Sequence, residues 1–109
     1  MEIIIIDNHS QDDSIGTIRN RLSCYENVHI VETPRNLGFG AGYNLGARFA
    51  HGQYLLINNP TKILERNAVE KIVHRMNKDP DIGILAPKII HADLTCRLST
   101  RAFPSPLDI

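Results

Sequence analysis

The sequence lacks a net charge, because its 12 basic residues are balanced by 12 acidic ones. A neutral chain has no bulk electrostatic attraction to phosphate backbones, so the composition argues against a nucleic-acid partner. It also lacks an apolar run approaching the ~20 residues that cross a bilayer, and neither end carries a targeting segment. We therefore expect a cytoplasmic protein, which in a longer form could sit at the inner face of the membrane.

Cysteine is scarce, with Cys24 and Cys96 as its two occurrences. Their separation does not fit a metal site, and no close group of cysteine and histidine accompanies them. In a chain without a secretion signal, such cysteines are most simply free thiols in a reducing compartment. The sequence therefore predicts no metal site built from these residue types.

The 109 residues are enough for one small domain with a core, and we expect residues 1–109 to form a single domain. Apolar patterns predict strands and helices in alternation. The strands are expected at residues 3–6, 28–31, 53–57, 82–86 and 88–90, and the helices after residues 12–14, at about 37–50, and from Glu65 or Asn67 to Lys78. Such alternation is typical of an α/β fold with a mostly parallel sheet and helices on both faces. About residues 93–109 are polar and proline-punctuated, which predicts an irregular tail.

Polar turns follow three of the predicted strands, at residues 7–10, 35–44 and 58–61. In an open parallel sheet the carboxyl ends of the strands share one edge, and ligands collect there. Three polar turns at one edge predict a binding site more strongly than any one of them does.

A glycine-rich stretch, residues 34–46, forms the middle turn and leads into the second predicted helix. Gly38, Gly40 and Gly42 leave out side chains where a backbone would approach a neighbour closely. A helix start also presents free N–H groups and the positive end of the helix dipole, which suits an anion such as a diphosphate. The alternative is a tight loop followed by a closely packed helix that binds nothing.

Three segments, residues 6–14, 36–46 and 55–60, together resemble family 2 glycosyltransferases in their order and spacing, and the rhamnosyltransferase-like branch is the most similar. The resemblance implies a GT-A fold, which is a Rossmann-like domain that binds a nucleotide-diphosphosugar. It further implies inverting transfer of a sugar, hexosyl or rhamnosyl, to an acceptor hydroxyl in polysaccharide or cell-envelope glycan synthesis. An unrelated dinucleotide binder is disfavoured, because no G-x-G-x-x-G motif follows the first strand.

The resemblance also supplies candidate residues for binding the donor. They are Asp7, Asn8, Ser10, Asn36, Gly38, Asn44, Asn59 and Thr61. In the family the aspartate at the position of Asp7 binds the nucleoside, while the asparagines and glycines shape the wall beside the diphosphate and sugar. Two alternatives stay open: Asp7 as a turn aspartate and Asn44 as a residue with a local hydrogen bond.

Three departures from the family pattern bear on activity. An earlier strand with a nucleoside contact has no match, and the later segment that carries the catalytic base lies past Ile109, so no catalytic residue is assigned. The family's acid after the third strand holds a divalent cation, Mg²⁺ or Mn²⁺, but Thr61 replaces it here. We therefore expect a partial enzyme that alone does not turn over substrate.

The alternative function is a catalytically inactive, truncated or degenerate relative that serves as a binding or assembly module. The strand at residues 3–6 would then use its exposed edge to pair with a second copy of the chain. For the enzyme, the expected partners are the nucleotide-diphosphosugar donor and a glycan or lipid-linked acceptor of unknown identity.

Overall fold

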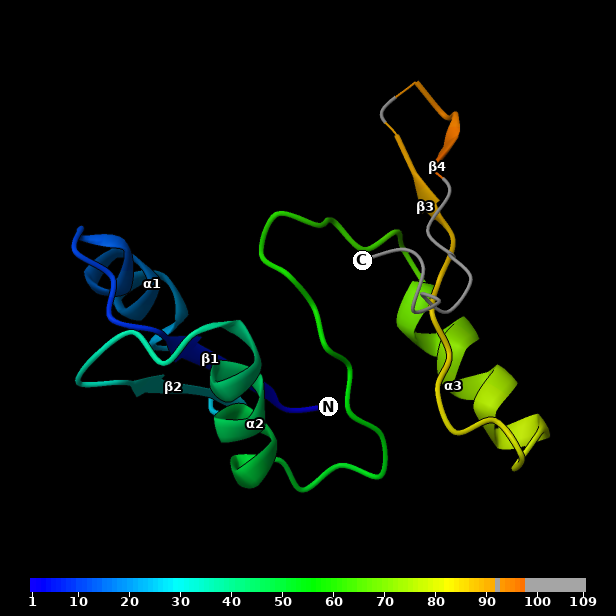
Figure 1. Cartoon of the computed structure of the whole chain (residues 1–109), viewed down its shortest axis with the longest axis horizontal. Coiled ribbons are helices and arrows are strands. Elements are labelled where there is room, and N and C mark those ends of the chain that lie inside the picture. Colours follow the sequence, from blue (N-terminus) through cyan, green and yellow to red (C-terminus); the bar gives the residue numbers. More distant parts are fainter. Residues whose placement is uncertain (92, 98–109) are drawn as a thin grey trace, which may run out of the picture. The chain divides into compact units, whose positions relative to one another are not determined.

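The computed structural model describes residues 1–91 and 93–97, and the chain divides into two compact units that meet between Lys62 and Ile63. Each unit contains its own helices and strands, shown in Figure 1. The first unit holds β1 (Ile3–Asp7), α1 (Ser14–Leu22), β2 (Val28–Glu32) and α2 (Phe39–Phe49), and the second holds α3 (Ala68–Lys78), β3 (Ile89–Ile90) and β4 (Cys96–Arg97). That residues 1–109 act as a single domain stays a prediction.

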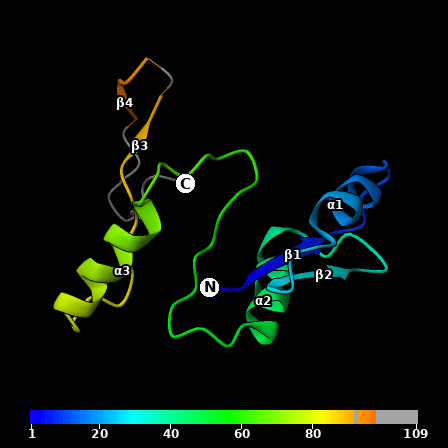
Figure 2. The ribbon, with the colours of Figure 1, turned by 180° about the vertical axis from the view of Figure 1, so that it is seen from behind.

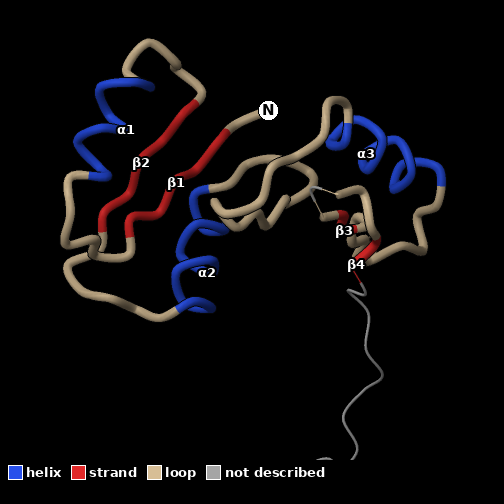
Figure 3. Tube along the Cα trace, turned by 90° about the horizontal axis from the view of Figure 1, so that it is seen from above, coloured by secondary structure: helices blue, strands red, loops and turns tan. Residues whose placement is uncertain are grey.

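The strands β1 and β2 form a parallel pair and run side by side in Figure 3. The register begins with Ile3 opposite Val28 and ends with Asp7 opposite Glu32. This confirms the first two predicted strands, each extended by one residue. Because the strands are parallel, the turns that follow Asp7 and Glu32 leave the same edge of the sheet.

Helices cover both faces of this pair. Ile5 lies opposite Ile30 and Ile6 opposite Val31, so these two pairs face opposite sides. The end of α1 borders the Ile30 face, where residues of both elements line a shallow hollow. Helix α2 lies on the Ile6 face, because a Cβ at Gly46 would be 3.3 Å from the Ile6 Cγ1 atom. The expected α/β architecture, with a parallel sheet between helices, is therefore present.

Helix α1 starts where the acidic cluster predicts. The backbone N–H of Ser14 donates to Asp12 Oδ1 at 3.1 Å, and Asp13 occupies the N-cap position without a side-chain cap bond. Hydrogen bonds from Ser14, first from its hydroxyl and then from its backbone, lower the pKa of Asp12. An ion pair between Arg19 and Glu32 joins α1 to the end of β2.

Helix α2 follows the glycine-rich turn and confirms the second predicted helix, although it begins at Phe39 rather than at Leu37. Its carboxyl end is attached to the start of the chain. Glu2 Oε1 accepts hydrogen bonds from the backbone N–H groups of His51 at 2.6 Å and Gly52 at 3.0 Å. The backbone N–H of His51 is the main cause of a lowered pKa at Glu2. The Glu2 carboxylate thus joins the start of the chain to the end of α2.

The third predicted strand, residues 53–57, is wrong, because this segment forms no strand. It is fastened at its two ends by side chains: Glu2 binds the Gly52 N–H, and Tyr43 Oη donates to the Asn58 carbonyl at 3.3 Å. Side-chain contacts do not offer the row of backbone groups that a strand requires. The run Leu55–Ile57 is consequently exposed.

The second unit also departs from the predicted parallel strands. Helix α3 follows Asn67 and ends at Lys78, as predicted. Residues 82–86 form no strand; the Ile82 N–H instead closes a turn onto the Asp79 carbonyl at 3.1 Å, and a glycine follows. The predicted strand at 88–90 is reduced to β3, which pairs antiparallel with β4. Residues 98–109 of the predicted tail lie outside the described residues.

Burial is modest in both units. Among the described residues no apolar side chain is fully buried, and Thr33 is the buried polar residue at 5% exposure. Helix α2 packs against β1, and this pair of elements is seen from behind in Figure 2. Cys24 and Cys96 are free and exposed. No helix within the described part of the chain has both the length and the apolar character needed to cross a bilayer.

Candidate functional site

The carboxyl end of β1 places Asp7 at the start of the first polar turn. Asp7 is half-buried, and its Oδ1 atom accepts hydrogen bonds from the backbone N–H of Ser10 at 3.1 Å and from the Ser10 hydroxyl. The other carboxylate oxygen, Oδ2, accepts none within the described residues. Ser10 therefore orients Asp7 and leaves one oxygen for a further hydrogen-bond donor, such as a nucleoside N–H or hydroxyl.

Asn8 joins this first turn to the glycine-rich turn. Its Nδ2 atom donates to Asn36 Oδ1 at 3.0 Å and to the Gly38 carbonyl at 3.3 Å. Its Oδ1 atom accepts from the Leu37 backbone N–H at 2.8 Å. The structure thus brings together two of the three polar turns that the sequence places at one edge.

Thr33 also makes hydrogen bonds at this junction of the two turns. Its backbone N–H donates to the Asp7 carbonyl at 2.9 Å, and its hydroxyl lies 2.8 Å from the Arg35 carbonyl and 3.2 Å from the Asp7 carbonyl. The sequence analysis gave Thr33 no role. The available signal was a hydroxyl residue next to Pro34, where the ladder between the strands must stop.

Gly38 has the geometry that the glycine-rich turn requires. Its φ of 81° lies in the region that favours glycine, and it occupies the N-cap position of α2. The Gly38 N–H donates to Asn36 Oδ1 at 2.8 Å, and the Gly38 carbonyl accepts from the Gly42 N–H at 3.1 Å. Gly42 is buried, and a Cβ there would meet the Asn8 side chain at 3.9 Å. The turn is therefore a tightly held helix start, which fits either of the two alternatives left open for it.

Asn44 projects from the second turn of α2 and is exposed. Its side chain makes no hydrogen bond with the described residues, so the local bond considered as its alternative role is not formed here. Its amide remains available to a ligand. Arg35 is likewise exposed, on the turn before Gly38.

The third polar turn is built by Asn59. Asn59 Oδ1 accepts hydrogen bonds from the Thr61 backbone N–H at 3.0 Å and the Thr61 hydroxyl at 2.8 Å. The Tyr43–Asn58 hydrogen bond connects this turn to α2, a connection that sequence reasoning also missed. Within the described residues no hydrogen bond joins Asn59 or Thr61 to Asp7 or Asn8. The structure therefore links this turn to α2 through Tyr43, and no hydrogen bond within the described residues links it to the first turn.

The residues at the third turn do not fit a divalent cation. The hydroxyl of Thr61 is directed to Asn59 Oδ1, and neither side chain carries the charge that Mg²⁺ and Mn²⁺ favour. No group of three histidine, cysteine, aspartate or glutamate side chains in the described ranges could hold a metal ion. We therefore derive no chemical step through a cation.

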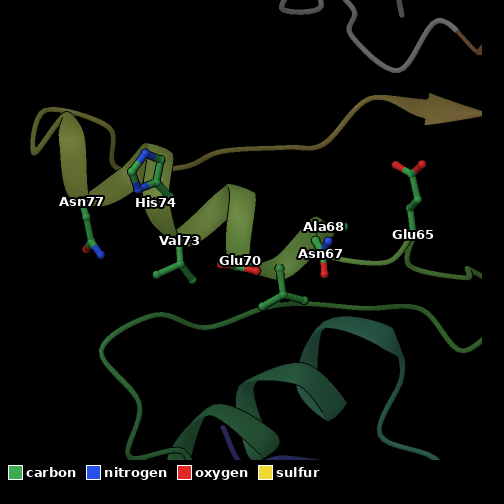
Figure 4. Close-up of a pocket in the computed structure, with 8 residues that line it drawn as sticks. Glu65, Asn67, Ala68, Glu70, Val73, His74 and Asn77 are labelled. Carbon is green, nitrogen blue, oxygen red and sulfur yellow. The ribbon is translucent and has the colours of Figure 1, made fainter.

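A separate hollow of about 550 Å³ lies along α3 in the second unit and contains none of the candidate residues. Figure 4 shows Val73, His74 and Asn77 along this helix. The hollow is wide open and combines aliphatic side chains with two glutamates, Glu65 and Glu70. It offers no cluster of groups suited to a nucleotide.

Comparison with known proteins identifies the family. Residues 1–101 match the family model described as glycosyl transferase family 2. The chain belongs to glycosyl transferase family 2. The family has a GT-A, Rossmann-like α/β fold, and its members bind nucleotide-sugar donors and glycan acceptors. The coarse part of the sequence prediction, a family 2 glycosyltransferase domain, is thereby confirmed.

Curated relatives of this family 2 chain include an uncharacterized glycosyltransferase of Haemophilus influenzae, 32% identical over 76 residues, which covers 70% of the chain and 30% of the relative. Two dolichyl-phosphate beta-glucosyltransferases of Trichomonas vaginalis also match. ALG5D is 26% identical over 72% of the chain and 25% of its own length, and ALG5A is 25% identical over 95% and 33%. The chain thus spans a third or less of these relatives. No solved structure matches it significantly.

Proposed function

We propose that this chain is the donor-binding part of a glycosyltransferase, which holds a nucleotide-diphosphosugar for transfer to an acceptor hydroxyl. The observation that carries the proposal is the set of hydrogen bonds from Asn8 to the glycine-rich turn. Those bonds hold the carboxylate of Asp7 and the start of α2 at one junction. A carboxylate suited to a nucleoside and a helix start suited to phosphate are the two features that such a donor needs.

The candidate residues differ in their proposed roles. Asp7 accepts a hydrogen bond from the base or ribose through its Oδ2 atom. The glycine-rich turn and Asn44 form the wall beside the diphosphate and the sugar. Asn59 and Thr61 complete the rim on the side of α2, without the acid that would bind a cation. The proposed product is a polysaccharide or a cell-envelope glycan, and the acceptor is a glycan or a lipid-linked sugar.

The resemblance of residues 6–14, 36–46 and 55–60 to the rhamnosyltransferase-like branch leads us to propose rhamnosyl or a related hexosyl transfer. The names of the two Trichomonas relatives point instead to glucosyl transfer for those proteins. Titration calorimetry with dTDP-rhamnose and UDP-glucose separates these donors, and each is tested with and without Mn²⁺. Absence of heat at millimolar concentrations of both ligands and of the free nucleotides would contradict donor binding by this chain.

The matched variants for this test are Asp7→Asn and Glu26→Gln. Both remove one negative charge, but Glu26 precedes β2 and therefore lies toward the opposite edge of the parallel pair. We expect Asp7→Asn to weaken nucleotide binding about tenfold or more, because hydrogen bonds to charged groups contribute about 1.5–3 kcal/mol. Glu26→Gln is expected to bind as the unaltered chain does. Equal affinities for both variants would remove Asp7 from the proposed site.

A second candidate function, a catalytically silent binding or assembly module, is favoured by one observation. Thr61 stands where the family carries an acid, and its hydroxyl is directed to Asn59. The proposed assembly contact is the edge of β1 that does not face β2. Light scattering tests for a dimer, and Thr61→Asp tests the site. Cation-dependent nucleotide binding in Thr61→Asp would show a pocket that lacks only its metal ligand, whereas a dimer without nucleotide binding would favour the assembly module.

A further inference from the structure

The amide of Asn8 is fully committed to the polypeptide. An asparagine side chain has two N–H donors and one acceptor oxygen. Both functions of Asn8 are in use, since Nδ2 contacts Asn36 Oδ1 and the Gly38 carbonyl, and Oδ1 accepts from the Leu37 N–H. These three contacts reach one short turn that lies 28 to 30 positions further along the chain, and Asn8 Oδ1 also lies 3.5 Å from the Thr33 hydroxyl. No N–H of Asn8 remains for a phosphate or a sugar.

Asn36 is used differently from Asn8. Its Oδ1 atom accepts two hydrogen bonds, from Asn8 Nδ2 at 3.0 Å and from the Gly38 N–H at 2.8 Å. Its own Nδ2 atom has no partner within the described residues. The oxygen of Asn36 therefore contributes to the turn, and its amide nitrogen does not.

We propose that Asn8 is a positioning residue that sets the conformation of the glycine-rich turn, acting through Asn36 and Gly38 rather than by touching the donor. The hydrogen bonds of Asn8 support its effect on the turn, and the effect on nucleotide binding rests on the proposed donor-binding function. Gly38 is the N-cap of α2 with φ of 81°, and its carbonyl receives both Asn8 Nδ2 and the first N–H bond of the helix. Asn8 thus fixes where the free N–H groups at the start of α2 point.

Replacement of the side-chain amide by a carboxylate is expected to disrupt the turn at position 8 and to preserve it at position 36. An aspartate at position 36 keeps the oxygen that accepts from Asn8 and Gly38. An aspartate at position 8 loses both N–H donors and sets a negative charge against the Asn36 oxygen and the Gly38 carbonyl. The protection of the Gly38 amide therefore reports whether each replacement keeps or disrupts the turn.

The experiment measures amide hydrogen exchange at Gly38 in the ¹⁵N-labelled chain, together with calorimetric affinity for UDP and dTDP. We expect Asn8→Asp to accelerate Gly38 exchange about fivefold to tenfold, which corresponds to the loss of a hydrogen bond contributing about 1 kcal/mol. The same variant should weaken nucleotide binding by a similar factor. The amides of the β1–β2 ladder report in the same spectra whether the fold is intact.

Asn36→Ala removes the oxygen that accepts from the Gly38 N–H, and Asn36→Asp keeps it. Asn36→Ala also replaces Asn8→Asp in the experiment if Asn8→Asp does not fold, because position 36 lies on an exposed turn. Asn36→Ala should release the Gly38 amide and weaken binding, and Asn36→Asp should restore the protection of the Gly38 amide. Unchanged Gly38 exchange in Asn8→Asp together with weakened nucleotide binding would overturn the proposal in favour of direct contact by Asn8. Unchanged Gly38 exchange in Asn8→Asp and Asn36→Ala would also overturn it. Protection that follows this pattern in a chain without nucleotide affinity would support the positioning role and refute the donor-binding function alone.

Discussion

In the first unit, Glu2 accepts hydrogen bonds from backbone groups 49 and 50 positions away, whereas in the second unit Arg75 pairs with Asp79 one helical turn further on. The Asn8–Leu37 bond repeats the first pattern over 29 positions. The β3–β4 hairpin repeats the second, with the His91 N–H bonded to the Thr95 carbonyl. Long-range contacts must form together as the chain folds, while local ones can form alone. We therefore expect a single substitution to destabilise many contacts in the first unit, but only neighbouring contacts in the second.

The largest effect is expected at the contact between α2 and β1. A Cβ at Gly46 would lie 3.3 Å from Ile6 Cγ1, so Gly46→Val must push the helix from the strand. Overpacking of this kind lowers the free energy of unfolding by about 1–3 kcal/mol, measured by urea denaturation. Gly40→Ala is the matched control, because nothing lies within 4 Å of its Cβ position in the same helix. Since alanine is the better helix former, the control should gain about 0.5–1 kcal/mol. A Gly46→Val chain as stable as the control would contradict the close packing.

A smaller effect is expected at Thr33, which is 5% exposed. Thr33→Val removes the hydroxyl that donates to the Arg35 carbonyl at 2.8 Å. Loss of one buried partner should lower the free energy of unfolding by about 1–2 kcal/mol, again by urea denaturation. Thr33→Ser keeps the hydroxyl and should lose clearly less. Equal losses in both variants would show that the hydroxyl contributes no more than the methyl group, and would contradict this role of the hydroxyl.

Glu2 gives the first unit a dependence on pH. The backbone N–H of His51 lowers the pKa of the Glu2 carboxyl, so the ionised form stabilises the folded chain. This contribution is complete above the ordinary glutamate pKa of about 4.3 and is lost as the pH falls through the lower pKa of the folded state. Glu2→Gln should reduce stability at neutral pH and flatten its decline in acid, as measured by urea midpoints along a pH series. Glu26→Gln, in the exposed turn before β2, is the control and should retain the decline. A decline as steep in Glu2→Gln as in this control would contradict the role of Glu2.

The smallest effect is expected in the second unit. Arg75 and Asp79 pair at 3.0 Å with side chains that are 57% and 36% exposed. Exposed pairs of this spacing contribute about 0.3–0.5 kcal/mol, so Arg75→Ala should change the urea midpoint little. Lys71→Ala, on the same helix, controls for the change in helix propensity. A loss at Arg75 as large as that at Gly46 would show that the second unit is held together over a longer range than its hydrogen bonds indicate.

The sequence predicted the elements whose pattern is local. The four isoleucines of β1 and the helical spacing of α2 and α3 are visible without knowledge of their neighbours. Residues 53–57 have an equally apolar pattern but form no strand, because a strand also requires the backbone of another segment beside it. A pattern in one segment does not say which segment lies next to it.

The candidate site shows the same limit. That Asp7 and the glycine-rich turn leave one edge of the sheet follows from parallel strands, and the structure brings these turns together. The hydrogen bonds of the Asn8 side chain with Leu37, Gly38 and Asn36 could not be predicted, because no spacing rule links residues 28 to 30 positions apart. The roles of Thr33 and Tyr43 were missed for the same reason.

The amide of Asn8 also has a consequence for the ageing of the protein. Asparagine side chains hydrolyse slowly to acids on heating and long storage, which replaces an NH₂ group by an oxygen. At position 36 this chemical damage would leave the accepting oxygen in place, whereas at position 8 it would remove both donors at once. Hydrolysis of this one amide in a stored sample would therefore disrupt the glycine-rich turn.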